Sequence, residues 1–141
     1  MTERELLQSF VDEHGYLSWL GLRVETVGDG RLEMRIPFDE KLLNPVTERD
    51  VIHGGIAATL VDTASGFALR TTLDDPEAAH LATTDLNVSY IRPMGNDLLA
   101  EATVVRSGDS MGVVTVTVWT VDPDGQRTEV AVGRTSYRLF R

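Results

Sequence analysis

The sequence predicts an α+β fold in which a long antiparallel sheet wraps around one central helix. Only one long segment, residues 54–72, places apolar side chains at helical spacing. Four later runs predict strands that reach about ten residues, well above the usual five or six. The order is therefore a short helix, two strands, a long helix and a meander of long strands. With 141 residues, the chain fits one domain spanning residues 1–141.

The N-terminal segment is predicted to form a short helix over residues 3–14. Thr2 followed by Glu5 has the pattern of a capping box, in which each residue satisfies a backbone N–H of the other. Apolar residues then recur at helical spacing up to Val11. Gly15 is expected to end this helix.

After Gly21 the apolar period changes to two, which predicts a β-hairpin. Residues 22–26 and 32–36 alternate apolar with polar side chains around the turn at residues 28–30. Residues 37–51 are rich in Pro, Asn, Asp and charge, and we expect a loop there.

The long helix has two apolar faces, and four strands follow it. One face carries the bulkier residues Ile56, Leu60, Thr63 and Phe67, and the other carries Ala57, Val61, Ala64 and Ala68. The Asp74-Asp75-Pro76 run is expected to end the helix. The predicted strands are residues 81–91, 98–106, 111–121 and 128–139.

The composition excludes several classes of function. A net charge of −9 argues against nucleic-acid binding, which needs a basic surface. The absence of cysteine removes disulfides, thiolate metal sites and a cysteine nucleophile, and it fits a cytoplasmic protein. No apolar run is long enough for a membrane span, and the N-terminal residues lack the layout of a signal peptide. Three scattered histidines offer no metal-ligand spacing, so we expect no metal.

The strongest chemical motif is His53-Gly54-Gly55 at the start of the long helix, with Asp62 nine residues after the histidine. A helix N-terminus offers unpaired N–H groups and the positive end of the helix dipole. Glycines there let a ligand approach the backbone closely, so the turn could polarise a carbonyl and stabilise an oxyanion. Asp62 has only small neighbours one turn away, so it is either solvated or available to a partner.

The two parts of this motif cannot act on one carbonyl within a single chain. Gly54 and Asp62 are eight residues apart, which is about 12 Å along a helix. Catalysis needs contacts of about 3 Å. If both residues serve one substrate, they must come from two subunits with antiparallel long helices. A two-fold homodimer would then hold two shared sites.

Residues 51–65 resemble the signature of the hotdog-fold acyl-CoA thioesterases. The match is best to the phenylacetic-acid-pathway thioesterase group, which is related to the 4-hydroxybenzoyl-CoA thioesterases. Residues 83–93, which end in Tyr-Ile-Arg-Pro, resemble a strand of the same family. The resemblance covers nearly the whole chain. It implies a hotdog fold and hydrolysis of an acyl-CoA to a free acid and CoA without a cofactor.

The resemblance also implies roles for the residues of the motif. Asp62 resembles the acid that acts as nucleophile or as general base for water. Gly54 resembles the glycine whose N–H polarises the thioester carbonyl, although Gly55 could take that place or contact the substrate. His53 resembles the histidine that shapes the turn and can hydrogen-bond near the carbonyl or thiolate.

Further roles follow from the resemblance outside the motif. Asn44 is the candidate for an amide in the preceding loop, although it lies nine residues before His53 where relatives commonly show about six. Thr83 is the candidate for a hydroxyl that orients the water, with Thr84 as the alternative if the register slips by one. Arg92 could bind CoA phosphates, and a structural role at the strand end is its alternative.

Two rival functions remain open at this point. A hotdog hydratase or dehydratase of acyl thioesters would use a histidine paired with an acid in a different motif, which the sequence lacks. A non-catalytic acyl-CoA-binding module would not need the acid at position 62. The resemblance implies a homotetramer built from two dimers. Tyr16, Trp19 and Leu20 could line the mouth of the acyl pocket or pack locally.

Overall fold

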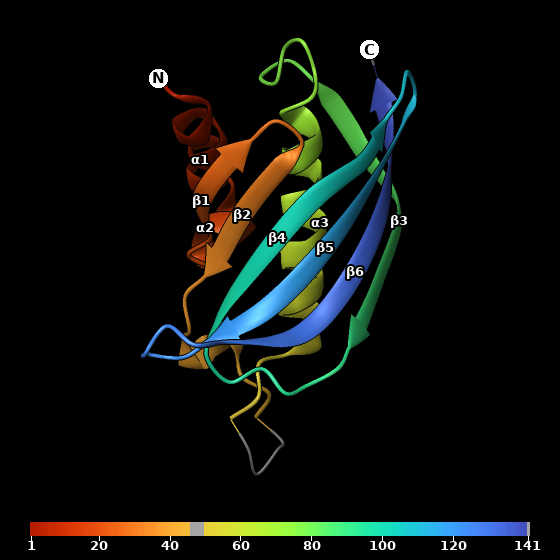
Figure 1. Ribbon diagram of the computed structural model, residues 1–141. Coiled ribbons are helices and arrows are strands. Elements are labelled where there is room, and N and C mark those ends of the chain that lie inside the picture. The colour runs from red at the N-terminus through yellow and green to blue at the C-terminus, as the bar shows by residue number, and fades with distance from the viewer. Residues whose placement is uncertain (46–49, 141) are drawn as a thin grey trace.

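A six-stranded antiparallel sheet curves around the helix α3 (Gly54–Arg70), as Figure 1 shows. The computed structural model describes residues 1–45 and 50–140. The strand order is β1-β2-β4-β5-β6-β3, so β3 lies at one edge of the sheet although it precedes β4 in the chain. The predicted sheet around one long helix is confirmed, but the predicted meander is wrong for β3, which pairs with β6 and not with β4.

The other predicted helix and strands lie close to their predicted positions along the chain, and two short helices, α2 and η1, were not predicted. The elements besides α3 are α1 (Glu3–Glu13), α2 (Gly15–Trp19), β1 (Arg23–Gly28), β2 (Arg31–Ile36), the short 3-10 helix η1 (Glu40–Leu42), β3 (His80–Tyr90), β4 (Asp97–Ser107), β5 (Met111–Val121) and β6 (Arg127–Phe140). Within the described ranges, no helix is both long and apolar enough to cross a membrane.

The prediction that Gly15 ends the first helix is wrong. The capping box of Thr2 and Glu5 is present, but α1 ends at Glu13 and Gly15 is the first residue of α2. His14 separates the two helices because its backbone is extended and its Nδ1 accepts a hydrogen bond from the Leu17 N–H at 3.2 Å. The histidine thus acts as the N-cap of a second helix.

The segment predicted as a loop contains more order than expected. Beyond η1, Leu43 forms an isolated antiparallel bridge with Ile52, and the Asn44 N–H donates to the Val51 carbonyl at 2.9 Å. Residues 46–49 of this predicted loop lie outside the described residues. The bridge sets the direction in which the chain enters α3.

The centre of α3 packs directly on the concave face of the sheet. Ala57, Val61, Ala64 and Ala68 of the small-residue face are fully buried, as is Leu60 of the bulkier face. A Cβ at Gly133 of β6 would lie 2.7 Å from the Val61 side chain, so only glycine allows helix and strand to come this close. This contact places the residue after Val61, the candidate acid, beside β6 and its neighbour β3.

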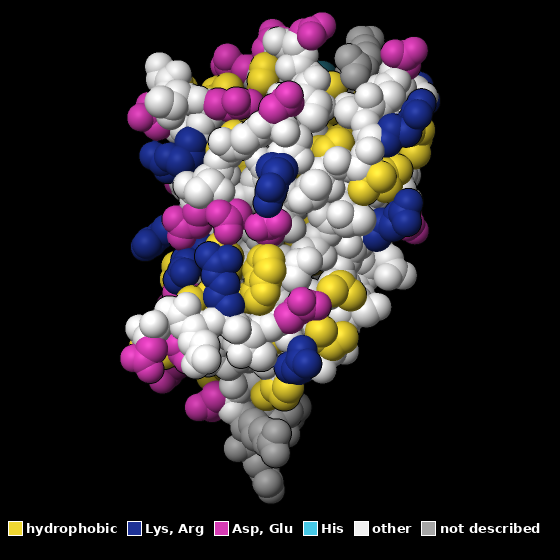
Figure 2. Space-filling model, in the orientation of Figure 1, with side chains coloured by type: hydrophobic (Ala, Val, Ile, Leu, Met, Phe, Trp, Pro, Cys, Tyr) yellow, Lys and Arg dark blue, Asp and Glu magenta, His cyan; other side chains and the backbone are white. Residues whose placement is uncertain are grey.

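Arginine and acidic side chains are interspersed over the outer face of the sheet, among uncharged polar and some hydrophobic side chains, as Figure 2 shows. Arg31 pairs with Glu101 at 2.9 Å, and Arg35 pairs with Asp97 at 2.7 Å. Exposed pairs of this kind stabilise a fold by about 1 kcal/mol or less. The candidate acid lies on the opposite, helix side of the sheet, because it follows Val61 on α3.

Candidate active site

The first turn of α3 presents one backbone N–H that is free to bind a ligand. His53 is the N-cap, and its Nδ1 accepts a hydrogen bond from the Gly55 N–H at 2.8 Å. A neutral imidazole with Nδ1 as acceptor carries its proton on Nε2. Within residues 1–45 and 50–140, the Gly54 N–H donates no hydrogen bond. Of the two glycines, Gly54 therefore keeps the available donor.

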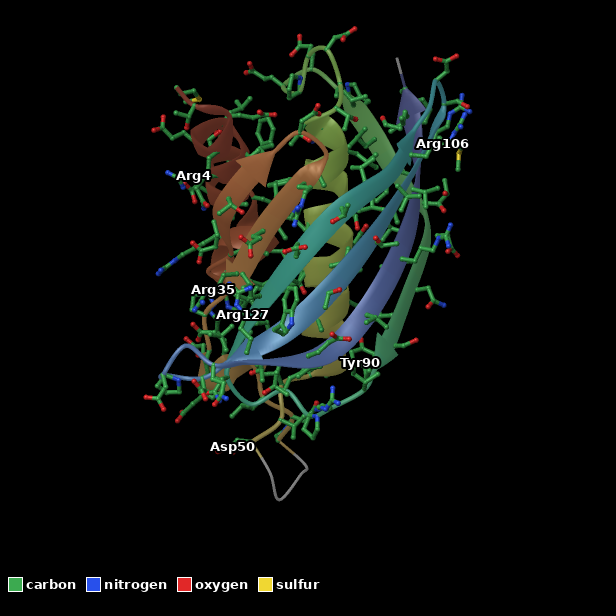
Figure 3. The ribbon with its side chains drawn as sticks, viewed as in Figure 1. Arg4, Arg35, Asp50, Tyr90, Arg106 and Arg127 are labelled. Atoms are coloured by element: carbon green, nitrogen blue, oxygen red, sulfur yellow. The ribbon has the colours of Figure 1, made fainter. Side chains whose placement is uncertain are left out.

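Tyr90, the last residue of β3, holds this turn from the strand side. Its hydroxyl donates to the Gly54 carbonyl oxygen at 2.5 Å, and Figure 3 shows the labelled side chain at the end of β3. A Cβ at Gly54 would lie 3.2 Å from the Tyr90 ring, so the glycine allows the ring to approach. Burial raises the pKa of Tyr90, which keeps its hydroxyl protonated as a donor.

A cavity of about 300 Å³ lies next to Gly54. Its lining includes Asn44, Tyr90 and Arg92, so it joins the segment before α3 to the end of β3. The Arg92 guanidinium donates to the backbone carbonyl of Glu129 at 2.8 Å, which anchors it across the end of the sheet. The cavity therefore combines a free backbone donor with an amide and a cation.

Asp62 lies two turns further along α3 and is half-buried. Its Oδ1 accepts a hydrogen bond from the Thr83 hydroxyl at 2.7 Å and another from the Tyr137 hydroxyl. Thr83 comes from β3, and Tyr137 comes from β6. An acid in mid-helix is thus held by two strands that the sheet topology places side by side.

Tyr137 is a proton donor throughout the physiological pH range. It is 5% exposed, and burial is the main cause that raises its pKa far above its ordinary value. The hydrogen bond to the Asp62 carboxylate raises the pKa further, and the hydrogen bond with Thr83 lowers it. The protonated hydroxyl therefore donates to Asp62, where Oδ1 of the carboxylate and the backbone carbonyl oxygen both lie within hydrogen-bond distance.

A second cavity, of about 340 Å³, opens beside Asp62. Its lining includes Tyr16 and Leu17 from α2, Thr59 from α3 and Leu86 from β3. The Tyr16 and Thr59 hydroxyl oxygens lie 2.9 Å apart at its border. Its volume is at the small end of the range for ligand pockets, about 300–1,000 Å³.

The two cavities separate Gly54 from Asp62, although Gly55 lines the second cavity together with Asp62. Gly54 lines the first and Asp62 the second, and both belong to the same continuous helix. Eight residues of α-helix separate them by about 12 Å. One chain therefore offers a carbonyl-polarising donor in one place and a carboxylate in another.

Comparison with known proteins identifies the family of a chain with this fold and these residues. Residues 50–125, which include Gly54, Asp62 and Thr83, match the model of the thioesterase superfamily. This chain belongs to the thioesterase superfamily.

Two relatives show how far the similarity of this thioesterase extends. A protein of Halobacterium salinarum is 54% identical, and the match covers 96% of this chain and 91% of that protein. Its name assigns it provisionally to the esterases. Human acyl-coenzyme A thioesterase 13 is 26% identical over 80% of this chain and 79% of its own length. The predictions of a thioester hydrolase and of this family are confirmed.

A solved structure has the same fold as this thioesterase. A thioesterase family protein from Silicibacter pomeroyi superposes with a TM-score of 0.85 over 99% of this chain and 98% of that protein, at 24% identity. The hotdog fold predicted from the sequence is thereby confirmed. Membership of the phenylacetic-acid-pathway group stays a prediction.

The structure brings the predicted residues of the thioesterase together in two sets. Asp62 contacts Thr83, whereas the Thr84 hydroxyl turns away and donates to the Ser136 carbonyl at 3.1 Å. Asn44, Gly54 and Arg92 form the other set. The register of β3 thus favours Thr83 over Thr84, because a bulge between Thr83 and Asp85 shifts the strand there.

The three residues considered for the mouth of the acyl pocket differ in position. Leu20 is 2% exposed and belongs to the core. Tyr16 lines the cavity beside Asp62. Trp19 is about half exposed, and the Lys41 ammonium lies 4.5 Å from its ring centre, outside both cavities.

Sequence reasoning missed the contacts of two tyrosines. Tyr137 is an inward-facing position in a long alternating strand, and nothing local distinguishes it from a core aromatic residue. Tyr90 stands in the Tyr-Ile-Arg-Pro run, which marked a family resemblance without indicating what the hydroxyl touches. Strand pairing across the sheet was needed to place either hydroxyl beside α3.

Proposed function

We propose that this thioesterase hydrolyses an acyl-CoA to a free acid and CoA. The observation that carries the proposal is the pair of half-sites on α3, a free Gly54 N–H and an Asp62 carboxylate held by two hydroxyl groups. The name of the human relative, acyl-coenzyme A thioesterase 13, supports CoA thioesters as the substrate class. An anionic substrate would also find the Arg92 guanidinium at the cavity beside Gly54.

In the proposed reaction, the thioester carbonyl oxygen accepts a hydrogen bond from the Gly54 N–H. The positive end of the α3 dipole adds to the stabilisation of the negative charge that develops on this oxygen. His53 holds the turn in the shape that presents this N–H, because its Nδ1 occupies the neighbouring Gly55 N–H. Removing one such donor typically lowers the rate by about 10²–10³-fold.

Asp62 supplies the second half of the reaction in one of two ways. As a nucleophile, its carboxylate adds to the carbonyl carbon, the carbon–sulfur bond breaks, and water then hydrolyses the acyl–aspartyl anhydride. As a general base, it takes a proton from the water that attacks the same carbon. In both cases CoA leaves as a thiolate, so a strong general acid is not required.

Both half-sites can serve one substrate only if two subunits contribute to it. The edge strand β3 supports this part of the proposal. One of its edges has no partner strand in the sheet, and exposed strand edges readily pair with another chain. Leu86, Tyr90 and Ile91 along this edge are 41%, 49% and 47% exposed, which is high for large apolar side chains.

The contacts at the two ends of β3 suit an antiparallel pairing of two copies. Near one end Thr83 contacts Asp62, and at the other end Tyr90 contacts Gly54. A two-fold pairing about the middle of β3 would set the Thr83 end of one copy beside the Tyr90 end of the other. The Asp62 half-site of each subunit would then face the Gly54 half-site of its partner.

The experiment that tests the function follows thiol release from a panel of acyl-CoAs. We expect the wild-type protein to release CoA and Asp62→Asn to lose roughly 10²–10⁴-fold in kcat while keeping its fold. Asp109→Asn is the matched control, because it removes the same charge from an exposed turn between β4 and β5. Hydrolysis by Asp62→Asn at the wild-type rate would disprove the role of Asp62.

The same panel separates the rival functions. A hydratase would change the absorbance of an enoyl-CoA without releasing thiol, and a binding module would bind the CoA ester without forming product. The cytoplasmic location, the homotetramer and the assignment of residues 1–141 to one domain stay predictions from the sequence.

A further inference from the structure

The two oxygens of the Asp62 carboxylate have different surroundings. Oδ1 accepts from Thr83 and lies within hydrogen-bond distance of the Tyr137 hydroxyl, which also lies 2.5 Å from the backbone carbonyl oxygen of Asp62. No hydrogen bond from the described part of the chain reaches Oδ2. Donors held by two different strands therefore fix the orientation of the carboxylate and leave one oxygen available.

The Tyr137 hydroxyl packs against Gly66 of α3, where a larger residue would leave too little space. A Cβ at Gly66, one helical turn after Asp62, would lie 3.1 Å from this hydroxyl oxygen and 3.3 Å from the ring. The glycine therefore leaves room for the phenol between β6 and α3. The ring cannot move away easily, because Tyr137 is 5% exposed and Leu139 on the same face of β6 is 2% exposed.

We infer that Tyr137 is a positioning residue, whose hydroxyl acts with that of Thr83 to hold Oδ1 of Asp62 so that Oδ2 is the oxygen that reacts. This inference rests on the proposed role of Asp62. Two donors on Oδ1 draw electron density from that oxygen and restrict the rotation of the carboxylate. Attack or proton abstraction therefore takes place through Oδ2. The orientation is set before substrate binds, which lowers the cost of reaching the reactive geometry.

A purely structural role for Tyr137 makes a different prediction. If the phenol only filled the space between β6 and α3, its hydroxyl could be removed without changing the chemical step. Tyr137→Phe makes that change, because it keeps the ring and deletes only the oxygen. The variant should keep its fold, since the ring still fills its place and Oδ1 of Asp62 still accepts from Thr83.

The test compares five variants by steady-state kinetics with one acyl-CoA that the wild-type protein hydrolyses. We expect Tyr137→Phe to lower kcat roughly 10-fold with KM changed by less than about 2-fold, since the lost bond acts on the chemical step. In an Asp62→Asn background, Tyr137→Phe should produce no further loss, because the group that it positions is gone. Thermal unfolding checks that every variant is folded.

Two more variants make the test specific. Thr135→Val is the matched control, because Thr135 faces the same side of β6, is fully buried, and has a hydroxyl without a hydrogen-bond partner among the described residues. It should keep wild-type kcat. Gly66→Ala keeps the Tyr137 hydroxyl but places a methyl group 3.1 Å from its oxygen, so we expect it to disturb the contact with Asp62 and to lower kcat by less than Tyr137→Phe does.

The outcomes separate this inference from the proposed function. Wild-type kcat in Tyr137→Phe, together with an inactive Asp62→Asn, would overturn the inference and leave the proposed function standing. An equal loss from Tyr137→Phe in both backgrounds would also overturn it, because the effect would not pass through Asp62. Activity in Asp62→Asn would instead contradict the proposed function itself.

Discussion

The Thr83 hydroxyl and Oδ1 of Asp62 lie 2.7 Å apart, and this contact joins the edge strand β3 to the middle of α3. Seven residues further along the same strand, the Tyr90 hydroxyl lies 2.5 Å from the Gly54 carbonyl oxygen at the start of the helix. β3 thus contacts both half-sites of one subunit. Any change in the position of this strand would act on the carboxylate and on the carbonyl-polarising turn together.

The two neighbouring threonines of β3 should differ sharply in their effect on catalysis. Thr83→Val removes a hydroxyl that donates to Asp62, so we expect kcat to fall roughly 10-fold. Thr84→Val removes a hydroxyl that donates to the Ser136 carbonyl, away from the site, and should leave kcat near the wild-type value. Thiol-release kinetics on both variants measures the difference. A larger loss in Thr84→Val would mean that the register of β3 at the site differs by one residue.

Two substitutions at Gly54 separate its N–H from its small size. Both proline and alanine add a Cβ near the Tyr90 ring, but only proline removes the N–H. Proline suits the first position of a helix, so α3 should still form in Gly54→Pro. We expect Gly54→Pro to lose about 10²–10³-fold in kcat and Gly54→Ala to lose far less. Equal losses of kcat in the two variants would show that the added side-chain bulk, and not the missing N–H, slows the reaction.

Mixing two inactive variants tests whether the site is shared between subunits. A mixed dimer of Asp62→Asn and Gly54→Pro would contain one site with both defects and one site with none. Refolding an equimolar mixture should therefore restore about one quarter of the wild-type sites, whereas each variant refolded alone stays inactive. Differently tagged subunits show whether mixed dimers have formed. If mixed dimers form and no activity returns, Gly54 of one subunit and Asp62 of the other do not act on the same substrate.

The stability of the protein in alkali should depend on Tyr137. Burial and the hydrogen bond to Asp62 raise the pKa of Tyr137 in the folded state, whereas in the unfolded chain it ionises near the ordinary value of about 10. Below about pH 10, neither the folded nor the unfolded state releases this proton, so the raised pKa of Tyr137 contributes its full stabilisation. At higher pH the unfolded state alone releases it, so the free energy of unfolding falls as pH rises.

Tyr137→Phe should therefore lose less stability than the wild-type protein between about pH 9 and pH 11. Urea unfolding at several pH values measures this slope for both proteins. Parallel pH dependence in the two proteins would show that Tyr137 ionises equally easily in the folded and unfolded states, contrary to its buried position beside Asp62.

Local patterns were sufficient to predict most of the secondary structure. The capping box at Thr2, the helical spacing after Gly54 and the two-residue period of the long strands each depend on neighbours in sequence, so they can be recognised without tertiary contacts. The end of the first helix was predicted wrongly at Gly15. The reason is that the His14 side chain caps a second helix, and histidine is an uncommon capping residue.

The candidate site could be predicted only in part. The distance between Gly54 and Asp62 could be predicted, because both lie on one helix and eight residues of α-helix span about 12 Å. The choice between the two glycines could not be made in the same way. It depended on the His53 side chain, which turns back to accept the Gly55 N–H.

The sequence by itself thus determined the fold class, the chemical motif and the need for two subunits if both halves act together. Only the tertiary structure decided which groups surround the carboxylate. Tyr137 meets Asp62 from 75 residues away, and Thr83 rather than Thr84 reaches it because of a bulge in β3. Contacts of this kind depend on strand register and on the close packing of α3 against β6, and no local pattern in the chain specifies either.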